Sequence, residues 1–274
     1  MPISNYPNGF SQGVSILGMP VLNSYAGSVF WVNSNGGSDG NKGTRERAFG
    51  TLDYAIGKCT ANKGDIILVA PNHAETITGA SGITFDVAGI TVVGMGNYNQ
   101  RPRFLMDGGT TVTAVISAAD VTLSNMVFAS GHADVVTCFG VTAVGSWFDQ
   151  IEFSDNAANE NWLSCIKGTG TTDNEADGMR VTNCRWVSPD AGGLEMIEWN
   201  SDVSESVLSG NTILWGHGLQ AAACCHGQEH SGDCLHRQQC RYRQHGWRFV
   251  DRQRLYGQHW DRCQQPYRPS RHGQ

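Results

Sequence analysis

The stretch "VTLSNMVF", Val121 to Phe128, decides the fold, because runs of the same kind recur along the chain. Each is a short alternating run with a small or amide residue near its centre, which here is Asn125. The other runs are "ITVVGMG" from Ile90, "SWFDQIEF" from Ser146, "MRVTNCRWV" from Met179 and "SVLSGNTIL" from Ser206. The centres, 31, 25, 33 and 27 residues apart, are Gly94, Asn125, Gln150, Asn183 and Gly210. Repetition on this scale indicates a solenoid, in which each rung buries its apolar side by stacking on its neighbours.

The period of the pattern within each run limits the kind of solenoid. Alternation with period two is typical of strands, and it excludes helical repeats such as tetratricopeptide repeats. A coil of three short strands and their turns needs roughly 20 or more residues, so the spacing predicts an all-β parallel β-helix. A β-sandwich of short strands is the alternative. The recurring rung favours the β-helix.

A short helix is expected just before the main run of strands. The segment "TLDYAIGKC" places Leu52, Ala55, Ile56 and Cys59 on one helical face, with Thr51 as a candidate N-cap. A strand, "VFWVN" from Val29, and a polar loop precede this segment, and the buried strand in "KGDIILVA" from Lys63 follows it. Because an open β-helix end exposes unpaired backbone groups, we expect the helix to cap the N-terminal end.

Composition divides the chain. It has 274 residues, 40% of them hydrophobic, which is enough for a sizeable core. Residues 1–220 carry 10 Lys and Arg against 21 Asp and Glu, whereas residues 221–274 carry 9 against 4. We therefore predict a leader at 1–28, a β-helix at 29–219 and a separate tail at 220–274. The sequence shows neither a run of about 20 apolar residues nor the basic and apolar regions of a signal peptide.

The tail allows two interpretations. From residue 221 it has no Asn, Lys, Thr, Ile or Met, but nine Arg and nine Gln. Its basic and aromatic residues would suit a nucleic-acid-binding arm. Alternatively the reading frame has shifted: permitted codons for "QQCRYRQHG", 238–246, read one base later give Asn-Asn-Ala-Asp-Ile-Val-Asn-Thr. The shift explains the missing and the excess residues in one event, so we favour it, predict an irregular or poorly packed tail and consider nucleic acid an improbable partner.

The cysteines favour buried free thiols over disulfides or a metal site. Those before the tail are widely spaced within apolar patterns: Cys59, Cys138, Cys165 and Cys184. The tail holds a cluster that lacks two matched C-x2-C pairs and so does not predict a zinc site: Cys224, Cys225, His226, His230, Cys234, His236 and Cys240.

The block "VFWVNSNGGSDGNKGT … FGTLDYAIGKC … GDIILVAPNHAET" resembles the opening of pectate-lyase-like right-handed β-helix proteins. With the leader "MPISNYPNGFSQGVSILGMP" it is similar to structural proteins of tailed phages and prophages. The resemblance covers about residues 1–219. It implies a right-handed β-helix in a virion, assembled in the bacterial cytoplasm, whose partners are other virion proteins, a host-surface glycan and further copies in a homotrimer. Fold membership alone assigns no chemistry.

Many β-helix relatives cut acidic polysaccharides, so carboxyl pairs are of interest. Glycoside hydrolysis needs two carboxyl groups about 5 to 9 Å apart. Asp149 with Glu152, and Glu195 with Glu198, are candidates. Residues three apart in a strand point to opposite faces, which weakens both pairs unless a turn intervenes. "WGHGL" around His217 resembles the Gly-His-Gly of polygalacturonases, but the expected Asn-Thr-Asp, Asp-Asp and Arg-Ile-Lys partners do not occur at matching places.

A lyase would need a basic residue beside a calcium site. The basic residues of the central rungs are Lys167, Arg180 and Arg185, and the weak calcium candidates, in the loop "GTGTTDNEADG", are Asp173, Glu175 and Asp177. We expect a solvated loop there, and His73 and His132 as surface or turn residues. The leading hypothesis is a non-enzymatic virion protein, the second a polysaccharide depolymerase, and the third a nucleic-acid binder.

Overall fold

The computed structural model describes residues 27–157, 159–169, 175–188, 192–199 and 203–215, and the backbone of four further short strands. All the described side chains belong to one unit, Met1–Arg243. Two of the four short strands, β1 (Val14–Ile16) and β2 (Met19–Val21), form an antiparallel pair within the predicted leader. Among the described residues no helix is long and apolar enough to cross a membrane.

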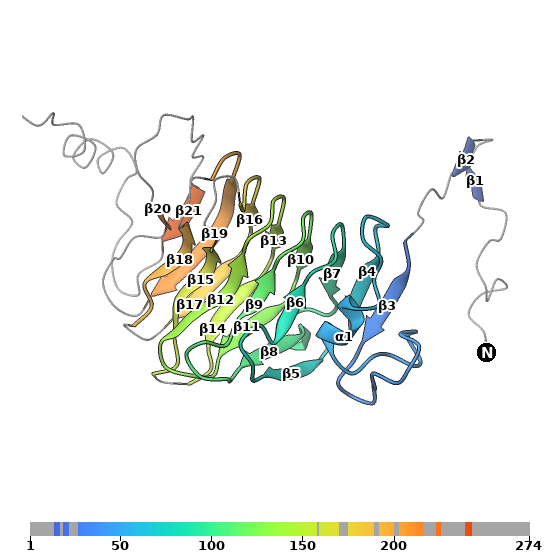
Figure 1. The fold of residues 1–274 in the computed structure, drawn as a ribbon, viewed down its shortest axis with the longest axis horizontal. Coiled ribbons are helices and arrows are strands. Elements are labelled where there is room, and N and C mark those ends of the chain that lie inside the picture. The colour runs from blue at the N-terminus through green and yellow to red at the C-terminus, as the bar shows by residue number, and fades with distance from the viewer. Residues whose placement is uncertain are drawn as a thin grey trace, which may run out of the picture. The chain divides into compact units, whose positions relative to one another are not determined.

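The chain forms a right-handed parallel β-helix, as predicted, with three parallel sheets (Figure 1). Sheet A contains β3 (Val29–Val32), β4 (Ile66–Val69), β7 (Thr91–Gly94), β10 (Thr122–Ser124), β13 (Trp147–Asp149) and β16 (Arg180–Thr182). Sheet B contains β5 (Ala74–Ile77), β8 (Arg103–Met106), β11 (Val127–Ser130), β14 (Glu152–Asp155) and β17 (Arg185–Ser188). Sheet C contains β6 (Ile83–Phe85), β9 (Ala114–Ile116), β12 (Val135–Val141), β15 (Trp162–Gly168), β18 (Glu195–Trp199) and β20 (Ala223–Cys225). The long strand β19 (Val207–Trp215) pairs with β16 and then with β17, so it joins sheets A and B.

The strand register confirms the repeat read from the sequence. On sheet A the residues that lie side by side in successive rungs are Val92, Leu123, Phe148, Val181 and Leu208. Their numbers differ by 31, 25, 33 and 27, the same intervals as the predicted centres. Each rung therefore begins where the sequence pattern places it.

The predicted centres form the corners between sheets A and B. Asn125, Gln150, Asn183 and Gly210 have φ between 53° and 69°, in the left-handed region that glycine and asparagine adopt most readily. Gly94 differs, because it ends β7 in the first of these rungs along the chain and has no left-handed φ. A Cβ at Gly94 would collide with the carbonyl oxygen of Asn125, so close approach of the next rung requires glycine there.

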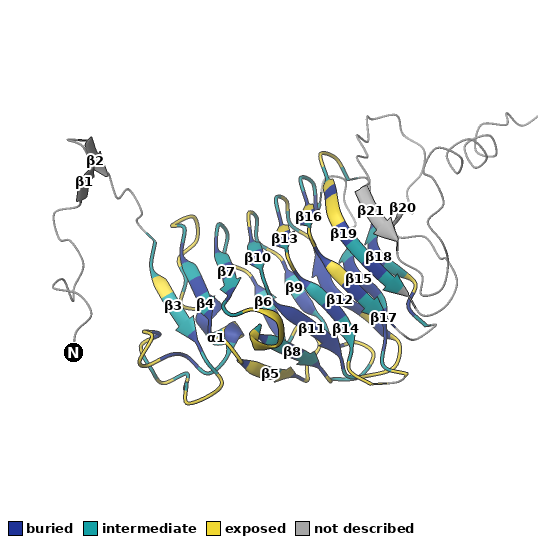
Figure 2. Ribbon diagram, turned by 180° about the vertical axis from the view of Figure 1, so that it is seen from behind, coloured by how far each residue is buried: buried dark blue, intermediate teal, exposed yellow. Residues whose placement is uncertain are grey.

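The core fills the interior of the coil. Buried side chains alternate along the strands, and the burial pattern is continuous from one rung to the next (Figure 2). On sheet B, Phe104, Phe128 and Phe153 lie side by side, and the first two rings stack with centroids 5.0 Å apart. Phe139 from sheet C packs edge-on against Phe128 at 4.7 Å. Stacked rungs thus share one aromatic interior, as a solenoid requires.

The N-terminal helix α1 (Leu52–Ile56) is shorter than the predicted segment but buries the predicted Leu52, Ala55 and Ile56. It packs against β3, β4 and β6 (Figure 1). Thr51 occupies the N-cap, but its side chain makes no capping bond to the helix. Instead Asp39 accepts the N–H groups of Gly50 and Thr51, and Glu75 accepts that of Leu52. The predicted cap position is therefore confirmed, whereas the capping groups come from elsewhere in the chain.

Most of the predicted tail lies outside the described residues. After residue 215 the structure describes only the backbone of β20 and of β21 (Gln239–Tyr242), which pair with β18 and β19. The cysteine and histidine side chains of the tail fall outside the described part, and the frameshift stays a prediction. The predicted domain boundaries likewise stay predictions.

Candidate functional site

Sheet C has a local irregularity that repeats in three rungs. In β12, β15 and β18 two consecutive residues belong to the core instead of one: Cys138 with Phe139, Cys165 with Ile166, and Met196 with Ile197. The residues on either side of each pair are then on the outward face. This places residues three apart on the same side of the sheet, contrary to the simple alternation expected of a strand.

As a result, Glu195 and Glu198 lie on one face. In register, Glu195 is opposite Ser164, and Glu198 is opposite Lys167 of the preceding rung. Glu198 accepts a 2.6 Å hydrogen bond from Ser164 Oγ and forms a 2.7 Å ion pair with Lys167 Nζ. The side chains of Lys167 and Glu198 are 20% and 22% exposed, so solvent reaches both. The prediction that this carboxyl pair diverges was wrong, because the two consecutive inward residues restore a common face.

These four residues, Ser164, Lys167, Glu195 and Glu198, are called the sheet C cluster. Its two carboxyl groups and one ammonium are chemically suited to hold sugar hydroxyls, or to exchange protons with a bound sugar. The ion pair between Lys167 and Glu198 also has a structural effect, since it joins two adjacent rungs. The sequence could not predict the cluster without the irregular strand geometry.

Asp149 and Glu152 are separated by the corner at Gln150, which places them on different sheets. Asp149 Oδ1 accepts hydrogen bonds from Thr182 Oγ1 at 2.7 Å and Asn183 Nδ2 at 3.0 Å. Glu152 Oε2 lies 2.6 Å from an Arg101 nitrogen and 3.5 Å from an Arg185 nitrogen. Each carboxylate therefore has its own set of partners on its own sheet.

Two arginines cross the outer surface of sheet B. Arg101 precedes β8 yet bonds Glu152 on β14, so its side chain passes β11, the strand between them. Arg103 on β8 likewise donates to Asn156, directly after β14, at 3.0 Å. Both outward residues of β11, Val127 and Ala129, are buried. The arginine stems explain this burial, because long charged side chains can cover apolar surface while their head groups stay polar.

The calcium candidates divide between described and undescribed residues. Asp173 lies outside the described part, as does the catalytic candidate His217. Asp177 accepts hydrogen bonds from the backbone N–H and the hydroxyl of Ser204 at 2.7 and 2.8 Å, and Glu175 is partly buried nearby in sequence. Among the described residues no group of three His, Cys, Asp or Glu could hold a metal ion. Asp177 thus links one turn to the turn of the next rung.

The two histidines differ from each other. His132 is exposed after β11, as predicted. His73 closes the turn that starts at Ala70, which agrees with the turn alternative of the prediction, but its side chain is fully buried and not at the surface. Its Nδ1 accepts the N–H of Ser34 at 2.9 Å, which places the proton of the neutral ring on Nε2, 3.1 Å from Glu75. Because Glu75 also accepts the first N–H of α1, His73 positions the helix-capping carboxylate.

The four cysteines of the β-helix are free thiols, as predicted. Cys138, Cys165 and Cys184 are buried, while Cys59 is only partly buried. Burial raises the pKa of Cys184 to about 12, and burial together with the nearby Asp65 carboxylate raises the pKa of Cys59 to about 12. Burial also raises the pKa of Cys138 and Cys165 well above the ordinary value. None of them is set up as a nucleophile, which requires a lowered pKa.

The comparisons with known proteins concern the fold. No protein-family model matches the chain, and no curated protein matches it. Among solved structures it is similar to a rhamnogalacturonan lyase, with 16% sequence identity and a TM-score of 0.51. The similarity covers 69% of this chain and 52% of that chain, so this chain spans about half of the lyase. At this identity the similarity shows the fold alone. The chain therefore has the right-handed parallel β-helix fold.

Proposed function

We propose that this chain is a non-enzymatic β-helix protein of a phage particle, and that it binds a glycan on the bacterial surface. The observation that carries the proposal is that the candidate carboxylates described in the structure are engaged in hydrogen bonds and ion pairs within the β-helix. Glu152 pairs with two arginines, Asp149 with Thr182 and Asn183, and Glu198 with Lys167 and Ser164. These bonds run between rungs, so they stabilise the stack.

The phage assignment rests on the resemblance of the leader and the first rungs to structural proteins of tailed phages. A stack of rungs with a continuous core suits this role, because it is stiff along its axis and presents long, flat faces. Other virion proteins and two further copies of the chain are part of the same proposal. Location in the virion follows from it.

Binding and turnover are measured on the same material. The full-length chain is immobilised and exposed to capsular polysaccharide and lipopolysaccharide from a panel of bacterial strains. We expect saturable binding to at least one preparation, with no new reducing ends and no absorbance from unsaturated uronates after prolonged incubation. Product release from any bound glycan contradicts the non-enzymatic assignment, and absence of binding to the whole panel contradicts glycan recognition.

A depolymerase is the second candidate, and one observation favours it. Glu195 and Glu198 share an outward face with Lys167, so two carboxyl groups and an ammonium group adjoin one surface. If the chain cleaves a glycan, Glu195→Gln or Glu198→Gln should lower kcat at least 100-fold. Glu205→Gln, at an exposed turn, is the matched control and should leave kcat unchanged. Turnover with this pattern would replace the first candidate by the second.

A further inference from the structure

An exposed tryptophan lies on the outward face of sheet A. Trp147 on β13 is 38% exposed, although the neighbouring Phe148 is fully buried in the core. Its Nε1–H donates a 2.9 Å hydrogen bond to Thr182 Oγ1 on β16. Thr182 in turn donates to Asp149 Oδ1 at 2.7 Å. The indole is therefore held in one orientation by a chain of two hydrogen bonds between adjacent strands.

This arrangement favours the binding of a ligand to the indole, because the ring loses little rotamer freedom when the ligand stacks on it. An indole is rigid and amphipathic, and its face offers a large apolar contact area beside polar groups. A hydrogen-bonded, exposed aromatic ring is thus preorganised for a flat ligand face. Pyranose rings have such a face, formed by their axial C–H groups.

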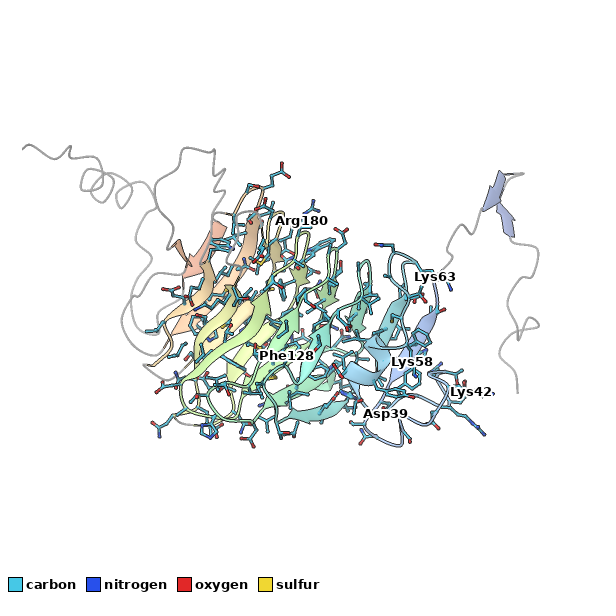
Figure 3. All side chains as sticks on the ribbon, in the orientation of Figure 1. Asp39, Lys42, Lys58, Lys63, Phe128 and Arg180 are labelled. Atoms are coloured by element: carbon cyan, nitrogen blue, oxygen red, sulfur yellow. The ribbon has the colours of Figure 1, made fainter. Side chains whose placement is uncertain are left out.

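Polar groups surround Trp147 on the same sheet. Arg180 is its register partner on β16 and is exposed. Within the described part of the chain, the guanidinium of Arg180, which is labelled in Figure 3, has no hydrogen-bond or ion-pair partner. Asp149 and the exposed Asn183 lie at the other end of these short strands. Carboxylate and amide groups bind hydroxyls, and a guanidinium binds a carboxylate through paired N–H donors.

We propose that Trp147, Arg180 and Asp149 form a binding site for one acidic sugar residue, such as a uronate. The pyranose stacks on the indole, its carboxylate pairs with Arg180, and its hydroxyls bond Asp149 and Asn183. This inference rests on the proposed glycan-binding function and names its sugar class and its face. The site lies on sheet A, separate from the sheet C cluster.

The experiment compares two probes that differ only at C6. One is a β-1,4-linked tetramer of glucuronic acid, and the other is cellotetraose, its neutral counterpart. Titration calorimetry is performed on the full-length chain and on Trp147→Ala, Trp147→Phe and Arg180→Gln. Val29→Ala changes an exposed outward residue at the far end of sheet A and is the matched control. Melting curves of all variants verify that they fold.

The acidic tetramer should bind the parent chain at least 10-fold more tightly than cellotetraose. Arg180→Gln should abolish this preference, Trp147→Ala should weaken both probes at least 10-fold, and Trp147→Phe should retain part of the affinity. Unchanged affinity in the Trp147→Ala and Arg180→Gln variants overturns the site while leaving glycan binding intact. Equal binding of both probes to the parent, or binding of neither, overturns the acidic-sugar assignment.

Two further outcomes separate this inference from its alternatives. If the parent binds bacterial glycans from the panel but neither tetramer, the proposed function stands and the sugar class is wrong. If Trp147 instead contacts a second copy of the chain, Trp147→Ala should change the sedimentation coefficient and not the affinity for the acidic tetramer. That result would also overturn the site.

Discussion

Single residues with left-handed backbone conformation set the corners between sheets A and B. Three of the four are amides, Asn125, Gln150 and Asn183, and the fourth is Gly210. The left-handed region costs a residue with a Cβ about 1–2 kcal/mol, and asparagine and aspartate tolerate it better than most such residues. These four corner residues were predictable as centres of the repeat, because the backbone requirement restricts the residue type at their rungs. Gly94, the first centre, is instead required by the close approach of Asn125.

Gln150 allows a direct test of this requirement. Its side chain is exposed and makes only a 3.3 Å contact with Asp149, so a substitution reports mainly on the backbone. We expect Gln150→Val to destabilise the chain by about 1–2 kcal/mol, because a β-branched residue is disfavoured at positive φ. Gln150→Gly should change stability by less than about 1 kcal/mol. Urea unfolding followed by circular dichroism measures both, and equal effects of Val and Gly would contradict the account.

The buried thiols give a prediction for alkaline pH. The folded pKa of Cys59 and of Cys184 is about 12, above the ordinary value of 9.0, so the folded chain retains protons that the unfolded chain releases. Their contribution to stability is fully present below pH 9 and is lost as the pH rises towards 12. Peptide mapping after iodoacetamide treatment at pH 8 should find these cysteines unmodified in the folded chain and alkylated in urea. Rapid alkylation of folded Cys184 would disprove its burial.

At the scale of elements, α1 shows what local sequence can and cannot predict. The apolar spacing of Leu52, Ala55 and Ile56 predicted the helix and its buried face correctly. Its caps, Asp39 and Glu75, lie 12 or more residues away in the sequence and reach the helix only in the folded chain. The common outward face of Glu195 and Glu198 was missed for a similar reason, since it depends on two consecutive inward residues that period-two alternation does not contain.

The Asp39 side chain (Figure 3) is the part of the cap best suited to mutation. It accepts two backbone N–H groups and the hydroxyl of Thr51, all between 2.9 and 3.0 Å. Asp39→Ala should lower the free energy of unfolding by about 1–2 kcal/mol, as is usual for loss of an N-terminal capping group. Asp39→Asn keeps an acceptor oxygen and should lose less. The midpoint of thermal unfolding compares the two, and an unchanged midpoint for Asp39→Ala would show that the cap is dispensable.

At the scale of the whole molecule, rung stacking was predictable because the repeat interval fixes which residues lie side by side. The side-by-side arrangement of Phe104, Phe128 (labelled in Figure 3) and Phe153 follows from that register. The outward position of Trp147 could also be read from the alternation of its rung. The fixed orientation of its indole, however, depends on the hydrogen bond to Thr182 of the next rung. Side-chain hydrogen bonds between rungs, such as this one, could therefore not be predicted from the sequence.

The tail leads to a prediction about the gene. The DNA around codon 220, translated in all three frames, should contain an open shifted frame rich in Asn, Ile, Gly and Thr that continues the rung pattern. A chain expressed from that corrected frame should melt at a higher temperature than the present one, because its last rung would gain a matched partner. Stop codons throughout the alternative frames would refute the frameshift.

The arginines that pass over β11 affect how the stack opens. In a simple linear array each unit is coupled only to the next, so one unit can loosen at an end while the others persist. Arg101 and Arg103 instead tie the rung that contains β8 to the rung that contains β14, across the rung that contains β11. Opening of the stack in this region must break these bonds between non-adjacent rungs together with the bonds between adjacent rungs. Hydrogen exchange of the backbone amides should therefore show the three rungs opening as one cooperative unit.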